Sequence, residues 1–233
     1  MAFCFYHTDQ DGWASGAIIK HRHNSIKMRP IDYGDEFPME EIKQDRDPVV
    51  FMLDFCPSDF SIVEELVEVC SIFVWIDHHV SSIQKAYDRD IFSKFHDGCR
   101  AFLDENHENY AACELTYMWA FDKNYEDVPY YIKLLGRFDN WSFSDKNTLP
   151  FQYGMRAWAD DPKKNMAVWK KLILNTEKDQ TQLKELINIG RYVLQYEESK
   201  NEQYAKSAAF ELEFNGLKAI ACNVGFTNSK FFN

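Results

Sequence analysis

Short, nearly uninterrupted apolar segments alternate with helical patterns through the first third of the chain. The apolar segments cover residues 2–6, 49–55 and 71–76, a further strand is expected over residues 27–33, and the helical patterns cover residues 13–21 and 58–70. Strands that alternate with helices predict right-handed crossovers and a parallel sheet. Continuous apolar strands predict that both faces of this sheet are covered. The sequence therefore predicts an α/β fold with a doubly wound, mainly parallel sheet.

These three apolar segments are followed directly by side chains that bind metal ions. The residues are His7, Asp9 and Asp11 after the first segment, Asp54 within the end of the second, and Asp77, His78 and His79 after the third. In parallel sheets, ligands bind beyond the carboxyl ends of the strands. We therefore expect these side chains to meet in one crevice, joined by Asp139, which follows a helical pattern over residues 130–138.

The types of side chain favour two divalent cations. The expected oxygen ligands are Asp9, Asp11, Asp54 and Asp139, and the expected nitrogen ligands are His7 and His78. Carboxylates and imidazoles without a thiolate suit manganese, and less ideally magnesium, cobalt or iron. Two such ions about 3.5–4 Å apart lower the pKa of a shared water and stabilise an in-line displacement at phosphorus. This predicts hydrolysis by a two-metal hydroxide mechanism.

A purely structural explanation of the same residues stays open. A single aspartate at the end of a strand is most often a turn residue or a helix cap. The sequence contains no G-x-S-x-G segment and no G-x-x-x-x-G-K-[ST] loop, so neither a serine hydrolase nor a P-loop enzyme offers an alternative.

Composition narrows the class of partner. The chain carries 26 Lys and Arg against 37 Asp and Glu, a formal net charge of −11. This balance argues against non-specific binding of duplex DNA, which needs basic side chains. It permits a nucleotide held through bound cations. No apolar run reaches the length of a membrane span, and no signal peptide is expected, so we expect a cytoplasmic protein without a membrane partner. The six cysteines form no C-x-x-C pair, and we expect them to be reduced.

The second half of the chain has a mainly helical pattern. Helices are expected over residues 110–122, 130–138, 163–175 and 181–208, with a loop over residues 144–162. Asn215-Gly216 between two apolar runs predicts a β-hairpin, which we interpret as the opening of a small second α/β domain. The expected organisation is a catalytic domain over 1–150, a loop and linker helices over 151–208, and a domain fragment over 209–233.

The four motifs, in this order, resemble motifs I to IV of the DHH phosphoesterase superfamily. They are the segment from His7 to Gly12, Asp54, the tripeptide Asp77-His78-His79, and Asp139. The superfamily includes RecJ-type exonucleases, nano-RNases such as NrnA and NrnB, cyclic-dinucleotide phosphodiesterases and polyphosphatases. Residues 111–117 also resemble a helix start of NrnB-like members.

The resemblance implies a role for each motif residue. His7 and Asp9 would hold one manganese ion, Asp11, His78 and Asp139 the second, and Asp54 both. Asp77 would orient the neighbouring imidazole, since histidines that bind metals usually need such a partner. His79 would contact the scissile phosphate. Arg137 is a further candidate for a phosphate contact, with an ordinary ion pair as its alternative.

The C-terminal part of the chain departs from the superfamily pattern. Members usually carry a C-terminal associated domain with a Gly-Gly-Gly-His segment that grips the substrate, and this chain contains no such segment. Residues 210–233 resemble only the beginning of that domain. The expectation is a truncated associated domain and a substrate cleft that lacks one wall.

The resulting expectation is a manganese-dependent phosphodiesterase that cleaves short single-stranded oligonucleotides to 5′-mononucleotides. One alternative keeps the chemistry but changes the substrate to cyclic dinucleotides, 3′-phosphoadenosine 5′-phosphate or polyphosphate. Another is a binding module that contains metal but does not catalyse. A homodimer is left open.

Overall fold

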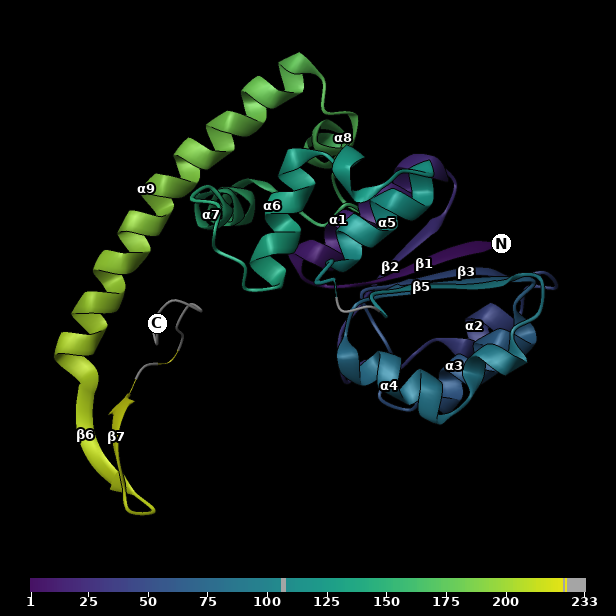
Figure 1. Cartoon of the computed structure of the whole chain (residues 1–233), viewed down its shortest axis with the longest axis horizontal. Coiled ribbons are helices and arrows are strands. Elements are labelled where there is room, and N and C mark those ends of the chain that lie inside the picture. The colour runs from purple at the N-terminus through teal and green to yellow at the C-terminus, as the bar shows by residue number, and fades with distance from the viewer. Residues whose placement is uncertain (106–107, 224, 226–233) are drawn as a thin grey trace.

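A parallel five-stranded sheet forms the centre of the N-terminal half in the computed structural model, which describes residues 1–105, 108–223 and 225 (Figure 1). Its strands are β1 (Ala2–His7), β2 (Lys27–Ile31), β3 (Val49–Leu53), β4 (Ile72–Asp77) and β5 (Cys99–Leu103). They lie in the order β2-β1-β3-β4-β5, and every neighbouring pair is parallel. The predicted α/β fold class is confirmed.

The order of the strands creates a crevice beside β1. The chain runs from β1 outward to β2 on one side and then continues through β3, β4 and β5 on the other. Such a reversal opens a gap at the carboxyl ends of the two strands where it occurs, here β1 and β3. The register pairs Tyr6 with Leu53 and Leu53 with Ile76, so the residues that follow these three emerge at the same level.

Helices cover both faces of the sheet. The helices α1 (Gln10–Arg22) and α5 (Ala112–Phe121) lie on one face, and α2 (Met39–Lys43), α3 (Ser61–Val69) and α4 (Val80–Asp88) on the other (Figure 1). Alternate residues of β1 enter different cores: Cys4 and Tyr6 pack on the side of α1, and Phe3 and Phe5 on the side of α3. Because the side chains of β1 before His7 enter apolar cores on both faces, the strand is apolar at every position from Ala2 to Tyr6.

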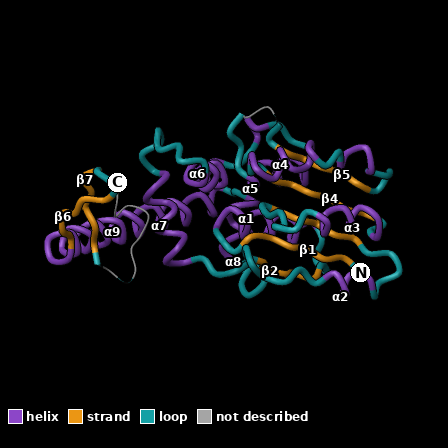
Figure 2. The backbone as a smooth tube through the Cα atoms, turned by 90° about the horizontal axis from the view of Figure 1, so that it is seen from below, coloured by secondary structure: helices purple, strands orange, loops and turns teal. Residues whose placement is uncertain are grey.

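The second half is helical and ends in a hairpin. The helices are α6 (Tyr130–Asp139), α7 (Thr148–Trp158), α8 (Ala167–Leu174) and the long α9 (Glu177–Ala208), and the hairpin pairs β6 (Ala209–Phe214) with β7 (Leu217–Cys222). Asn215 and Gly216 both have positive φ, at 51° and 77°, as the expected two-residue turn requires. The hairpin is thus confirmed. It lies with α9 at the opposite end of the molecule from the sheet (Figure 2).

The predicted loop over residues 144–162 is wrong where α7 lies. Pro150 occupies the third position of α7, in the first turn, where a helix leaves backbone N–H groups unpaired and proline is tolerated. The helix packs very closely on α9: a Cβ added to Gly190 would lie 1.6 Å from the carbonyl oxygen of Pro150, and one added to Gly154 would lie 2.0 Å from that of Leu186. Tertiary packing therefore fixes this helix.

The elements β5, α4 and α2 of the α/β domain were not predicted from the sequence. The strand β5 is an edge strand in which Arg100 and Phe102 are exposed, so it lacks the continuous apolar pattern of the inner strands. The short α4 begins directly after His79. Among the helices described, none combines the length and the apolar composition that crossing a bilayer requires. Residues 224 and 226–233 of the expected domain fragment lie outside the described residues.

Candidate metal centre

The six expected metal ligands converge at the carboxyl edge of the sheet. They come from the end of β1, the start of α1, the residue after β3, the residue after β4 and the last residue of α6. Their donor atoms form three groups in which all atoms lie within 4.8 Å of one another. The groups are His7, Asp9 and Asp54; Asp11, His78 and Asp139; and Asp54, His78 and His79. The sequence placed Asp139 in a loop, whereas it ends α6.

The turn between β1 and α1 fixes the first group. Asp9 is the N-cap of α1, and its Oδ1 accepts a hydrogen bond from the Gly12 N–H at 2.9 Å. A Cβ added to Gly12 would lie 2.3 Å from the carbonyl oxygen of His7, so only glycine fits this close approach. The other carboxylate oxygen of Asp9 lies 3.0 Å from His7 Nδ1. The capping interaction thus aims Asp9 and His7 at the same point.

Asp32 supports His7 from the end of β2. Its Oδ1 lies 3.3 Å from His7 Nε2, and its Oδ2 accepts a hydrogen bond from the Thr8 hydroxyl at 3.0 Å. Histidines that ligate metals typically have a carboxylate on the second ring nitrogen. Sequence reasoning missed this residue, which lies within the strand predicted over residues 27–33; in the structure β2 ends at Ile31, and Asp32 directly follows it.

Asp11 is anchored by a helix distant in sequence. Its two carboxylate oxygens accept the backbone N–H groups of Ala112 and Cys113, each at 2.9 Å, at the start of α5. The positive end of a helix stabilises a carboxylate in this position. Burial nevertheless raises the pKa of Asp11 to about 6, and the negative charge of Asp139 adds to this effect. This contact gives residues 111–117 a physical role in holding Asp11 in place.

Asp54 lies at the junction of two groups, and its carboxylate has no hydrogen-bond partner among the described residues. Its side chain is 1% exposed, and neither carboxylate oxygen is paired in that part of the chain. The nearest nitrogen is His78 Nε2, at 3.4 Å from Oδ1. Burial raises the pKa of Asp54 well above its usual value, and the neighbouring Asp11 raises it further. A buried acid without a partner is costly, and a bound cation would remove that cost.

The backbone of Asp54 is also unusual. Its φ is 54°, in the left-handed region that residues other than glycine rarely adopt. Such strain persists where the surrounding structure enforces it, and it concentrates at functional sites. The hydrogen bond from Asp54 N to the carbonyl oxygen of Ile76, at 2.9 Å, holds the backbone against β4 in this conformation. The carboxylate is thereby held at the sheet edge between the two groups.

His78 faces three carboxylates of the cluster, so its protonated imidazole offsets part of their negative charge. Its Nε2 lies 3.1 Å from Asp139 Oδ2 and 3.8 Å from Asp11 Oδ2. Burial by itself would lower the pKa of His78, but the facing carboxylates of Asp139 and Asp54 outweigh it and raise the pKa to about 12. A divalent cation at this point would have to displace the imidazole proton.

Asp77 organises the other histidine. Its Oδ1 accepts hydrogen bonds from His79 Nδ1 at 2.7 Å and from the backbone N–H of His78 at 2.8 Å. Its hydrogen bond to the Asp77 carboxylate raises the pKa of the His79 imidazole. The imidazole that Asp77 orients is thus that of His79, rather than that of the expected ligand His78. A contact between His79 and phosphate stays a prediction.

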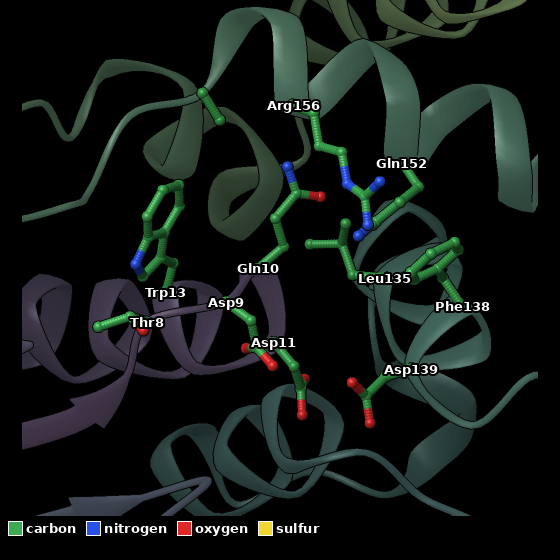
Figure 3. A pocket seen from close by; sticks show the side chains of 11 residues that line it. Thr8, Asp9, Gln10, Asp11, Trp13, Leu135, Phe138, Asp139, Gln152 and Arg156 are labelled. Atoms are coloured by element: carbon green, nitrogen blue, oxygen red, sulfur yellow. The ribbon is translucent and has the colours of Figure 1, made fainter. Parts of the chain in front are cut away.

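A pocket of about 350 Å³ adjoins the acidic cluster (Figure 3). Asp9, Asp11 and Asp139 lie on one side of it, and Gln10, Gln152 and Arg156 lie on the other. Sequence reasoning missed these last three residues. Gln152 and Arg156 are four residues apart on α7, a spacing that is informative only once the segment is known to be helical.

Arg137 makes the ordinary ion pair that was its alternative interpretation. Its Nη1 lies 3.0 Å from Asp145 Oδ2. The arginine that lines the pocket with the carboxylates is Arg156 instead. A phosphate contact by Arg137 stays a prediction and would require this pair to open.

The residues present fit a pair of divalent cations. Two groups of three ligands are linked through Asp54 and His78, the donors are carboxylates and imidazoles, and the buried Asp54 oxygens and His78 Nε2 lack hydrogen-bond partners in the described ranges.

Comparison with known proteins gives a shared fold. No family model and no curated protein matches the sequence. An uncharacterized protein from Helicobacter pylori G27 is similar in structure at a TM-score of 0.51 and 13% identity, covering 94% of this chain and 74% of its own.

More distant neighbours are an exonuclease RecJ bound to manganese and RecJ in complex with Mn²⁺ from Thermus thermophilus, each at a TM-score of 0.41 and 12% identity. Both comparisons cover 89% of this chain, but 65% and 37% of the respective RecJ chains. Membership of the DHH superfamily, and of its NrnB-like subfamily, stays a prediction from the motifs. The likeness to the Helicobacter protein shows a common fold, and the likeness to RecJ is too remote to indicate an activity.

Proposed function

We propose that this chain is a metal-dependent phosphodiesterase that hydrolyses short single-stranded oligonucleotides to 5′-mononucleotides, with manganese as the working metal. The observation that carries the proposal is the buried carboxylate of Asp54, unpaired among the described residues and lying between two groups of metal-type ligands. A structural acid would have a hydrogen-bond partner, since buried polar groups are nearly always paired. The superfamily resemblance of the four motifs supports the same conclusion.

The ligand groups suggest how the cations would be divided. The proposed division gives His7 and Asp9 to one site, Asp11, His78 and Asp139 to the other, and Asp54 to both; Asp54 shares one group with His7 and Asp9 and a second group with His78 and His79. When bound, such a pair supplies a hydroxide near neutral pH and stabilises the charge of an in-line displacement. The protein's part is to hold Asp11 on the start of α5, His7 on Asp32, and His79 on Asp77, so that the ligands do not reorganise during the reaction.

The proposed substrate is single-stranded because of charge and size. A net charge of −11 disfavours tracking along a duplex, and the pocket beside the cluster measures only about 350 Å³. Neither a membrane nor duplex DNA is among the proposed partners. The proposed catalytic unit extends beyond residue 150, because Gln152 and Arg156 of α7 line the same pocket as the ligands.

The test is hydrolysis of a dinucleotide with a panel of divalent cations. We expect turnover that requires added metal, is highest with Mn²⁺ and releases a 5′-mononucleotide. Asp54→Ala should reduce the rate by more than the roughly 10–100-fold typical of losing a partner that only supports a ligand. Asp122→Asn is the control, because Asp122 is an exposed residue with a similar φ of 51°.

The same assay separates the alternatives. Preference for a cyclic dinucleotide, 3′-phosphoadenosine 5′-phosphate or polyphosphate would change the substrate but keep the metal chemistry. Absence of turnover on every substrate, including bis-p-nitrophenyl phosphate, would favour the non-catalytic binding module. Full activity of Asp54→Ala would contradict the proposed centre.

A further inference from the structure

Four side chains with polar atoms form the wall of the pocket that faces the carboxylates. Gln10 comes from the first turn of α1, Trp13 from its next turn, and Gln152 and Arg156 from α7 (Figure 3). Both glutamines are deeply buried, at 7% and 5% exposure. The proposed cleavage of phosphodiesters does not use them.

Several polar atoms of this wall lack hydrogen-bond partners. Within the described part of the chain, Gln10 Oε1 and Nε2, Gln152 Oε1 and Trp13 Nε1 are buried and unpaired. Buried polar atoms are nearly always hydrogen-bonded, so an unpaired group requires an explanation. Here the unpaired atoms belong to three residues that line one cavity, which indicates that a ligand supplies their partners.

The mixture of donors and acceptors limits the chemistry of this ligand. A glutamine amide offers one acceptor oxygen and two donor hydrogens, whichever way it is turned. Phosphate oxygens only accept, so they cannot satisfy the oxygens of Gln10 and Gln152. The edge of a nucleobase presents donors and acceptors side by side, and glutamine pairs well with such edges.

Arg156 adds a flat, cationic surface at the same wall. Its guanidinium carbon lies 5.3 Å from the ring centroid of Phe138 and 5.3 Å from that of Tyr153. A guanidinium plane held against aromatic rings can stack on a base or approach the phosphate attached to it. With Trp13 on the side of α1, the pocket thus combines planar walls with amide groups.

We propose that this pocket binds the nucleoside part of the substrate, with the base edge paired to Gln10 and Gln152 and the attached phosphate directed toward Asp9, Asp11 and Asp139. The position of the phosphate rests on the proposed function. Gln10 lies between two metal ligands in sequence, so the turn that aims Asp9 and Asp11 also places the amide. The pocket therefore selects substrates that contain a nucleoside, and inorganic polyphosphate is a poor substrate.

The test is direct binding, which does not depend on turnover. Titration calorimetry of the protein, with and without Mn²⁺, compares AMP, GMP, CMP and UMP with ribose 5-phosphate and inorganic phosphate. At least one nucleotide should bind about ten-fold or more tightly than ribose 5-phosphate, since a bidentate amide–base pair contributes roughly 1–3 kcal/mol. In Gln152→Leu this preference should fall to about two-fold, while the exposed Gln203→Leu should retain it.

Two results would overturn the inference. One is equal affinity for nucleotides and ribose 5-phosphate in the unaltered protein. The other is a Gln152→Leu variant that weakens every ligand by the same factor, which would indicate a structural role. If Gln152→Leu does not fold, judged by its thermal unfolding, Gln10→Met serves in its place, with the same criteria.

The binding and hydrolysis experiments can refute the pocket and the proposed function separately. A preference for nucleotides without hydrolysis of any phosphodiester in the presence of metals would contradict the proposed function but support the pocket. Hydrolysis of dinucleotides and bis-p-nitrophenyl phosphate with equal kcat/KM, unaffected by Gln152→Leu, would support the metal centre and refute the pocket.

Discussion

Replacing Asp54 with asparagine should make the protein more stable than the unaltered chain in the absence of metal and less stable than it in the presence of metal. The carboxylate is 1% exposed, has a raised pKa and has no hydrogen-bond partner among the described residues. Leaving a buried polar group unpaired costs about 1–3 kcal/mol. Asparagine has nearly the same shape and tolerates positive φ; it carries no charge to repel Asp11, and its amide N–H groups can donate to the neighbouring carboxylates, so it should relieve this cost.

The length of the chain converts the expected free-energy changes into shifts of the melting temperature. In EDTA, Asp54→Asn should be more stable by about 2 kcal/mol, which corresponds to a rise in melting temperature of about 4–8 °C for a chain of this length. With Mn²⁺ at about 1,000 times its Kd, the unaltered protein should gain about 4 kcal/mol, or about 8–16 °C. The variant lacks an anionic ligand shared by both groups, so most of this gain should be lost.

The assay is thermal unfolding followed by circular dichroism, in EDTA and in Mn²⁺, with Asp122→Asn as a control. Asp122 has the same residue type and a similar φ of 51°, but it is exposed and lies outside the ligand groups. The control should respond to Mn²⁺ as the unaltered protein does. A variant at Asp54 that is less stable in EDTA, or that keeps the full response to Mn²⁺, would refute the reasoning.

Three further predictions use other parts of the structure. Glu114 is buried, which raises its pKa from 4.5 to about 7. Folding therefore takes up a proton between these pH values, and the free energy of unfolding falls as the pH rises through them. In urea unfolding, Glu114→Gln should be more stable than the unaltered protein by up to about 3 kcal/mol at pH 8 and equal to it at pH 4. Binding of Mn²⁺ at pH 7 should release a proton, because the pKa of His78 is about 12 without metal. Calorimetry in buffers of different ionisation enthalpy measures the number of protons released, and a binding heat that is the same in every buffer would contradict the prediction. Gly190→Ala should lower the melting temperature and weaken nucleotide binding, because its Cβ would lie 1.6 Å from the Pro150 carbonyl oxygen and displace α7. Gly225→Ala meets no atom of the described residues within 4 Å and should change neither.

The sequence determined those features that depend on neighbours along the chain. Inner strands are apolar up to their last residue because both of their faces are buried, and this pattern located β1, β3 and β4. Asn215-Gly216 specified its turn through the positive φ that these residues accept. Parallel strands end at one edge, so ligands at successive strand ends could be expected to meet.

Only the tertiary structure decided which groups face one another. The helix α7 forms because its glycine-bearing face packs on α9, a contact that local periodicity does not contain. The ion pair of Arg137 with Asp145, the support of His7 by Asp32 and the pocket wall made by Gln10 and Gln152 depend in the same way on the packed fold. Side-chain periodicity records burial on an element, whereas a partner is set by the position of the element that packs against it.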